Sequence, residues 1–167
     1  MPKITPFLWF DHQAEEAARF YTSVFKNSKV GRILRYDEAT AKAAGGLVGS
    51  VLTIEFEIEG QKFTALNGGP QFKFNESISF VVNCETQDEV DYFWEKLTAD
   101  GGQESACGWL KDKFGLSWQI TPTVLIDMLN DKDPEKSERV MKAMLQMQKL
   151  NIMELREAFE GGGSAVR

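Results

Sequence analysis

The chain has 167 residues, of which 43% are hydrophobic and 26% charged, and its formal net charge is −6. This composition is that of a globular protein with a substantial core. Because phosphate backbones and anionic membranes are bound by clustered lysine and arginine, the acidic balance argues against nucleic-acid and membrane partners. No apolar run approaches the roughly 20 residues that cross a bilayer. The two cysteines form no CxxC motif and no signal-peptide pattern is found, so we expect a reduced, cytoplasmic protein.

The first half of the chain predicts a strand, a helix and three further strands. Residues 4–10 have the pattern of a strand, and Asp11 is the expected N-cap of a helix over residues 13–25 with one apolar stripe. The connection 37–46 is polar and small, which is typical of a solvated loop, a short helix or a lid. The dipeptide Glu59-Gly60 predicts a two-residue hairpin turn. Three strands are expected after the helix, at residues 29–36, 48–58 and 61–67.

The second half repeats this pattern, with Phe93-Trp94 in its helix at the place of Phe20-Tyr21. Residues 77–83 predict a strand, and Thr86 caps the next helix with Glu89 completing a capping box. A weak strand near Gln103 then precedes a hairpin with strands at residues 108–113 and 116–121. Each βαβββ half alone leaves a sheet face uncovered, so two halves together can enclose a cavity.

The chain turns helical after the hairpin. Thr121-Pro122 and Asp133-Pro134 each have the pattern of an N-cap followed by proline at the first helical position. A helix from residue 133 to about 150 carries a methionine-rich stripe, which packs either on the same chain or on a second subunit. Asn151 begins a last short helix. The glycine-rich residues 161–167 are expected to form a flexible tail.

The second strand of the hairpin has one polar face. Side chains alternate along a strand, so Ser117, Gln119 and Thr121 share one side, and the other side carries Leu116, Trp118 and Ile120. A wholly polar face is unusual inside a small core. It predicts a sheet that lines a pocket.

Other reactive residue types have plain structural interpretations. His12 is the single histidine; without a positioned partner it is expected at the surface, with a role as general base or ligand as the alternative. Cys107 has no evident neighbour that would lower its pKa, and Cys84 shares a strand face with apolar residues. Three carboxylates alternate along one predicted strand, and we expect them to lie on its solvated face: Glu55, Glu57 and Glu59.

The motifs resemble a known family. They are FLWFD at residues 7–11, AEEA at 14–17, Phe20-Tyr21, ISFVV at 78–82 and GWLKDKFGLSWQI at 108–120. The chain is similar over about residues 3–158 to the PhnB-like branch of the vicinal oxygen chelate superfamily, which contains glyoxalases, bleomycin-resistance proteins and dioxygenases. This branch is often labelled 3-demethylubiquinone-9 3-methyltransferase.

The resemblance implies an α+β fold in which two βαβββ modules form a curved mixed sheet around a cavity, followed by C-terminal helices. The modules would span about residues 3–70 and 76–122, with a helical extension at 122–160. Together they are expected to form a single glyoxalase/bleomycin-resistance-like domain over residues 1–160.

Enzymes of the superfamily hold a divalent metal ion in the cavity through His or Glu side chains. The resemblance places these ligand positions at Pro6, near Ala65, at Ser77 and at Gln119. Proline and alanine donate no side-chain lone pair, and serine and a neutral amide are weak ligands for divalent ions. We therefore expect no metal and no other cofactor.

The sequence thus predicts a protein that binds an unidentified small organic ligand in a metal-free pocket, and a homodimer is expected. Few polar groups among apolar walls suit such a ligand. The alternative is an enzyme of the same superfamily, either metal-dependent at a rearranged site or acting as the methyltransferase label says. A third possibility is a protein whose role is interaction alone. No catalytic residue is assigned, and the residues expected to bind the ligand are Ser77, Ser79, Gln119, Ser117, Asn67 and Trp109.

Overall fold

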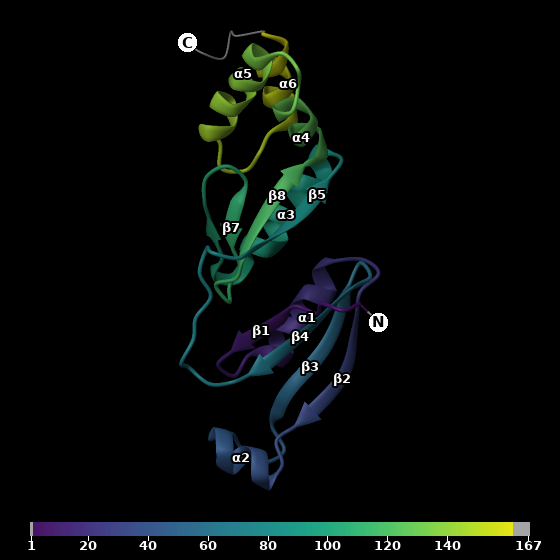
Figure 1. The fold of residues 1–167 in the computed structure, drawn as a ribbon, viewed down its shortest axis with the longest axis vertical. Coiled ribbons are helices and arrows are strands. Elements are labelled where there is room, and N and C mark those ends of the chain that lie inside the picture. Colours follow the sequence, from purple (N-terminus) through teal and green to yellow (C-terminus); the bar gives the residue numbers. More distant parts are fainter. Residues whose placement is uncertain (1, 162–167) are drawn as a thin grey trace. The chain divides into compact units, whose positions relative to one another are not determined.

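The computed structural model describes residues 2–161 and divides the chain into two compact units, Met1–Phe74 and Asn75–Arg167. Each unit contains one four-stranded mixed sheet (Figure 1), which confirms the α+β fold with two βαβββ modules and C-terminal helices. Among the described residues no helix is long and apolar enough to span a membrane. Apart from Gly161, the tail expected at 161–167 lies outside the described residues.

Unit 1 is the first module. Its elements are β1 (Phe7–Phe10), α1 (Ala14–Val24), β2 (Lys29–Arg35), α2 (Glu38–Ala44), β3 (Val51–Ile58) and β4 (Gln61–Asn67). The strand order is β1-β4-β3-β2, with β1 parallel to β4 and the other pairs antiparallel. The connection 37–46 therefore contains a short helix, because the Asp37 carboxylate accepts the Thr40 N–H and closes a capping box. Glu59 and Gly60 have φ angles of 48° and 84°, as a two-residue hairpin turn requires.

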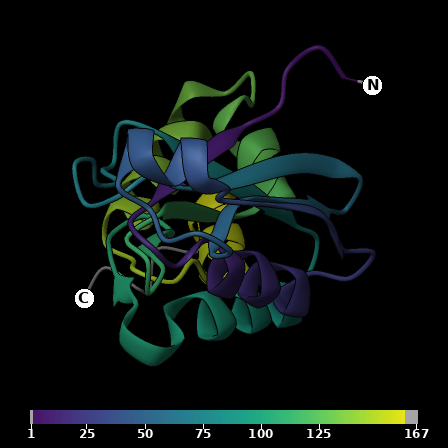
Figure 2. The ribbon, with the colours of Figure 1, turned by 90° about the horizontal axis from the view of Figure 1, so that it is seen from below.

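The core of unit 1 lies between α1 and one face of its sheet, against which α1 lies in both views (Figures 1 and 2). Alanines at the buried positions 14, 17 and 18 let the helix approach the strands closely. Tyr21 stacks on Phe56, which stacks in turn on Phe63. Since side chains alternate, Glu55 and Thr64 point to the opposite face of the sheet.

The N-terminus of α1 is capped differently from the prediction. Asp11 is not the N-cap, because the helix begins at Ala14 and Gln13 takes the capping position. The Ala14 N–H instead donates to the side-chain oxygen of Asn67, at 2.8 Å. The acceptor for this helical N–H group thus lies 53 residues away in the chain, so no local sequence motif predicts it.

Unit 2 contains the second module and the helical extension. The module consists of β5 (Ser79–Cys84), α3 (Gln87–Thr98), β6 (Gln103–Glu104), β7 (Trp109–Lys111) and β8 (Ser117–Pro122). The strand order β5-β8-β7-β6 repeats that of unit 1, again with the first strand parallel to the last. The Thr86 hydroxyl accepts the Glu89 N–H, as expected for the start of α3. The helix covers the sheet face that carries Leu110, Trp118 and Ile120.

The extension consists of α4 (Thr123–Leu129), α5 (Pro134–Leu145) and α6 (Ile152–Glu160). Two predicted boundaries were wrong. Pro122 ends β8 and is the N-cap of α4, so the start at Thr121 does not exist. The helix expected to reach about residue 150 ends at Leu145, because Met147 and Gln148 give their carbonyl oxygens to the N–H groups of Cys107 and Gly108 instead of continuing a helix.

The methionine-rich stripe divides between a core and the surface. Val140 is fully buried with Leu125, Met128, Leu150 and Leu155, and Met144 and Met147 pack against this cluster. Packing within the chain therefore accounts for part of the stripe. Met141 and Leu145 remain 41% and 56% exposed.

Candidate functional site

The sheet face of unit 2 that lies opposite α3 carries the polar side chains of the hairpin. Across β5, β8 and β7 the register places Ser79, Ser117 and Lys111 in one row. The neighbouring row consists of Val81, Gln119 and Trp109. The predicted alternation on the second hairpin strand is confirmed, since Trp118 and Ile120 are buried on the α3 side.

A hollow of about 430 Å³ opens where this face meets β6 and the loop before β7. This volume lies within the range of small-molecule sites. At the hollow, Lys111 forms an ion pair with Glu76, and the hydrogen bond from Lys111 lowers the pKa of the Glu76 carboxyl. The residues that line the hollow are Glu76, Gln103, Glu104, Ser105, Ala106, Cys107, Trp109, Leu110, Lys111 and Ser117.

Ser117 is the buried polar group of this hollow. It is 1% exposed, and its hydroxyl has no hydrogen-bond partner among the described residues. Burying a hydroxyl without a partner costs about 1–3 kcal/mol. Natural structures seldom retain such a group without a reason, and one reason is a bound molecule or water that completes the hydrogen bond.

Trp109 brings the second unused donor to the hollow. The other three indole N–H groups are engaged: Trp9 donates to the Gly69 carbonyl, Trp94 to Glu104 and Trp118 to Asp112. The Trp109 indole has no acceptor in the part of the chain that the structure describes. Its ring gives the hollow an aromatic surface on which a flat molecule can stack.

The other residues predicted to bind a ligand have different surroundings. Gln119 lies beside Trp109 on the same sheet face, where its amide donates to the Ser79 hydroxyl at 2.9 Å. Ser77 precedes β5, is exposed, and is bonded to the side chain of Asn75. Asn67 belongs to unit 1, where its amide bonds Ala14 and the Val51 carbonyl. The register and hydrogen bonds of unit 2 thus bring together Ser79, Ser117, Gln119 and Trp109.

Asp112 holds the hairpin in shape, and the sequence argument did not single it out. Its carboxylate is 2% exposed and accepts the N–H groups of Phe114, Leu116 and the Trp118 indole at 2.9, 3.1 and 2.9 Å. Gly115 at φ 88° completes the turn. The signal was present, because an Asp two residues before a Phe-Gly pair is typical of an Asx-turn. Asp112 thus fixes the turn that leads into β8, the strand that carries Ser117.

Unit 1 has a second hollow of about 430 Å³, on the face of its sheet opposite α1. Arg32 forms a two-pronged ion pair with Glu55 at 2.9 and 3.1 Å, which raises the pKa of Arg32 and lowers that of Glu55. Lys29 lies 3.9 Å from Glu57. These charges satisfy one another, whereas Ser117 in unit 2 has no partner, so the unit 2 hollow is the stronger candidate. The solvated carboxylate face was predicted correctly at residues 55 and 57, but Glu59 lies in the turn.

The family model and the solved structure of a relative point to the same family. The family model described as 3-demethylubiquinone-9 3-methyltransferase matches residues 2–121, more than two thirds of the chain. The chain belongs to this family. It is the PhnB-like family that the sequence motifs predicted. A comparison with curated proteins gave no significant match.

Solved structures agree with this membership. The PhnB protein of Bacillus cereus, which is described with the same family name, is 38% identical over 73% of this chain and 100% of its own, with a TM-score of 0.64. Protein PA1353 from Pseudomonas aeruginosa is 15% identical over 73% of this chain and 98% of its own, with a TM-score of 0.57. The fosfomycin resistance protein FosX from Listeria monocytogenes is 14% identical over 78% and 98%, with a TM-score of 0.55. The last two show the fold alone.

The metal positions of the superfamily do not carry metal ligands in this PhnB-like chain. The resemblance placed them at Pro6 and near Ala65 in unit 1, and Ala65 itself is fully buried on the α1 side of the sheet. The neighbours of these two positions on the open side are Thr5, Phe7, Thr64 and Leu66, none of which offers an imidazole or a carboxylate. Between residues 2 and 161 no group of three or more His, Cys, Asp or Glu side chains could hold a metal ion. The donor set does not fit the superfamily's divalent ion.

Of the single histidine and the two cysteines, only Cys107 lines the unit 2 hollow. His12 is exposed, with its ring nitrogen 3.5 Å from the Asp11 carboxylate. Cys84 is fully buried, and burial raises the pKa of its thiol to about 12. Cys107 is half-buried and lines the unit 2 hollow.

Proposed function

We propose that the hollow of unit 2 binds a small, partly polar organic molecule without the help of a metal ion. The observation that carries this proposal is the Ser117 hydroxyl, which is buried at the hollow with no partner among the described residues. A ligand that hydrogen-bonds to this hydroxyl removes the cost of its burial. That relief strengthens binding.

The lining defines the class of ligand. Trp109 offers a flat aromatic surface and an unused N–H donor, and Ser117 both donates and accepts. The Lys111–Glu76 pair is internally neutralised, so a strongly charged ligand gains little from it. These features suit a flat, uncharged molecule with a carbonyl or amide group.

Titration with benzamide, which has a flat ring and a neutral amide, tests this proposal. The indole N–H signals of the four tryptophans would be followed by NMR in the ¹⁵N-labelled protein. We expect the Trp109 signal to shift with a millimolar Kd, and Ser117→Ala to weaken binding about fivefold, the effect of one hydrogen bond. Ser137→Ala, at a partly exposed serine of α5 outside the hollow, is the control and should leave the Kd unchanged. Absence of a Trp109 shift with benzamide, phenol and benzoate alike would refute the proposal.

The metal-free character has its own test. Purified protein treated with chelator would be titrated with Zn²⁺, Ni²⁺, Mn²⁺ and Mg²⁺ and analysed for bound metal. We expect no stoichiometric binding. Tight binding of one ion per chain that Gln119→Ala abolishes would favour the alternative, a metal-dependent enzyme with a rearranged site.

We also propose that the protein is a homodimer. The open sheet faces carry apolar side chains that water disfavours: Phe7 is 59% exposed in unit 1, and Val81 is 48% exposed in unit 2. A second copy that covers these faces would remove them from solvent. Light scattering coupled to gel filtration should give twice the mass of 18.8 kDa, and a mass of one chain at micromolar concentration would refute this.

A further inference from the structure

The C-terminal extension lies outside the part of the chain that the family model matches. That match ends at residue 121, and α4 begins at Thr123. The extension builds a small core of its own around Val140 and Leu155, both fully buried. The extension buries its own apolar side chains in this core. Its polar contacts with the module are therefore not explained by the packing of its helices on one another.

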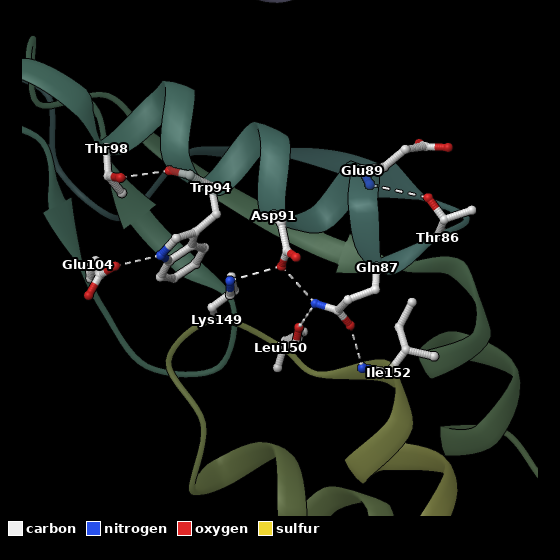
Figure 3. A network of polar contacts seen from close by, with 10 residues as sticks. All are labelled: Thr86, Gln87, Glu89, Asp91, Trp94, Thr98, Glu104, Lys149, Leu150 and Ile152. Carbon is white, nitrogen blue, oxygen red and sulfur yellow. Dashed lines mark hydrogen bonds and ion pairs between the residues drawn. The ribbon is translucent and has the colours of Figure 1, made fainter.

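The segment Met147–Ile152 joins the extension to the module through polar contacts that Figure 3 shows in part. Gln87, at the start of α3, donates to the Leu150 carbonyl at 3.1 Å and accepts the Ile152 N–H at 2.8 Å. Lys149 pairs with Asp91 at 2.9 Å, and this hydrogen bond lowers the pKa of the Asp91 carboxyl. Gln87 also donates to Asp91, so the three side chains form one network.

The same segment holds the loop before β7. The Cys107 N–H donates to the Met147 carbonyl, and the Gly108 N–H donates to the Gln148 carbonyl, each at 2.8 Å. Cys107 and Gly108 have φ angles of 60° and 83°, and the left-handed region is unfavourable for a cysteine. The two bonds to the extension help to keep this backbone in place.

Leu150 fixes the loop from the other side. It is 1% exposed, and a Cβ on Gly108 would lie 2.9 Å from both the Leu150 side chain and the Ile120 carbonyl. The backbone therefore approaches the extension as closely as a glycine allows. Cys107 and Trp109, which flank Gly108, both line the hollow that contains Ser117.

We propose that the extension positions the wall of the ligand hollow, with Gln87 and Lys149 as the positioning residues. This inference rests on the proposed function of the hollow. The chain of contacts runs from α3 through Lys149 and Leu150 to the loop at Cys107 and on to Trp109. Members of the family that end at β8 would have to hold this wall by other means, so the extension sets the shape of the site in this chain.

Hydrogen exchange and thiol chemistry together test the positioning without any ligand. The Cys107 thiol reports on the wall through its rate of reaction with 5,5′-dithiobis(2-nitrobenzoate). Cys84 stays silent near neutral pH because it is buried and its pKa is about 12. In Gln87→Ala we expect the amides of Cys107 and Gly108 to exchange about tenfold faster, and the thiol to react several-fold faster. In Lys149→Ala the effect should be about threefold.

The controls separate positioning from a general loss of stability. Lys149→Arg should restore the wild-type rates, because it keeps the ion pair with Asp91. Lys142→Ala removes a comparable pair, with Glu138 at 3.0 Å, from the same extension, and should leave both rates unchanged. Rates that do not change in Gln87→Ala, or that rise equally in Lys142→Ala, would overturn the inference.

Benzamide binding distinguishes this inference from the function on which it rests. If benzamide binds the wild type, Gln87→Ala should raise the Kd about fivefold. An unchanged Kd despite faster exchange would show that the wall is held by the extension but does not shape the site, which overturns the proposal. If benzamide does not bind the wild type while the exchange rates respond as expected, the proposed function fails and the positioning of the loop stands.

Discussion

Replacing Ser117 with alanine is expected to stabilise the protein while it weakens ligand binding. The hydroxyl is buried without a partner, so its removal lifts a penalty of about 1–3 kcal/mol. The void left by one oxygen atom, roughly 10–15 Å³, costs about 0.3 kcal/mol at about 24 cal/mol per Å³. The net expectation is a gain of about 1 kcal/mol in the free energy of unfolding.

Ser79→Ala is the matched control, because Ser79 lies directly opposite Ser117 in the register of β5 and β8. Its hydroxyl accepts the Gln119 amide at 2.9 Å, so its removal should cost about 0.5–1.5 kcal/mol. The same substitution on adjacent strands is thus expected to change stability in opposite directions, because Ser79 has a hydrogen-bond partner and the more deeply buried Ser117 has none.

Urea unfolding followed by tryptophan fluorescence measures both variants. We expect the midpoint to rise in Ser117→Ala and to fall in Ser79→Ala, with an unchanged dependence on urea. A loss of more than about 0.5 kcal/mol in Ser117→Ala would refute the reasoning, since it would mean that the hydroxyl makes a favourable bond in the folded protein.

Three further predictions follow from single residues. Asp112→Ala should cost about 3 kcal/mol in the same urea assay, because it leaves the buried Leu116 N–H and the Trp118 indole without their acceptor; a cost below about 1 kcal/mol would contradict this. Burial raises the pKa of the Cys84 thiol from 9.0 to about 12. The neutral thiol therefore contributes fully to the stability of the folded state below pH 9, and this contribution is lost as the pH rises through about 12. Unfolding free energy should fall by about 2 kcal/mol by about pH 10.5, and Cys84→Ala should flatten that slope. Glu59→Asn should stabilise by about 0.5 kcal/mol, because φ is 48° at this turn position; a lowered midpoint would show that the glutamate itself contributes.

The sequence predicted which side chains share the polar sheet face because strands have a period of two. The alternation of Ser117, Trp118, Gln119 and Ile120 assigns each side chain to a face without knowledge of any tertiary contact. The turn at Glu59 was equally local. Predicted helix boundaries were wrong where a residue far away in the chain determines them. At the start of α1, for example, Asn67 supplies the acceptor that Asp11 was expected to provide.

The sequence could not predict how deeply each polar side chain is buried or which group it bonds. Ser79 and Ser117 are the same residue type on the same face, but one accepts from Gln119 and the other has no partner among the described residues. The family metal position near Ala65 has the same limit, because a shift of one residue moves a side chain to the opposite face of the sheet, and Ala65 itself is buried.

The sequence by itself determined the family, the two βαβββ modules and the poverty of metal-binding side chains, because these depend on residue types and short-range periodicity. Tertiary structure decided which serine is left without a partner, where the long C-terminal helix ends, and that residues 147–150 dock against the loop at Cys107. Each of these depends on groups far apart in the chain that compete for the same hydrogen bonds, and no local pattern encodes the outcome of that competition.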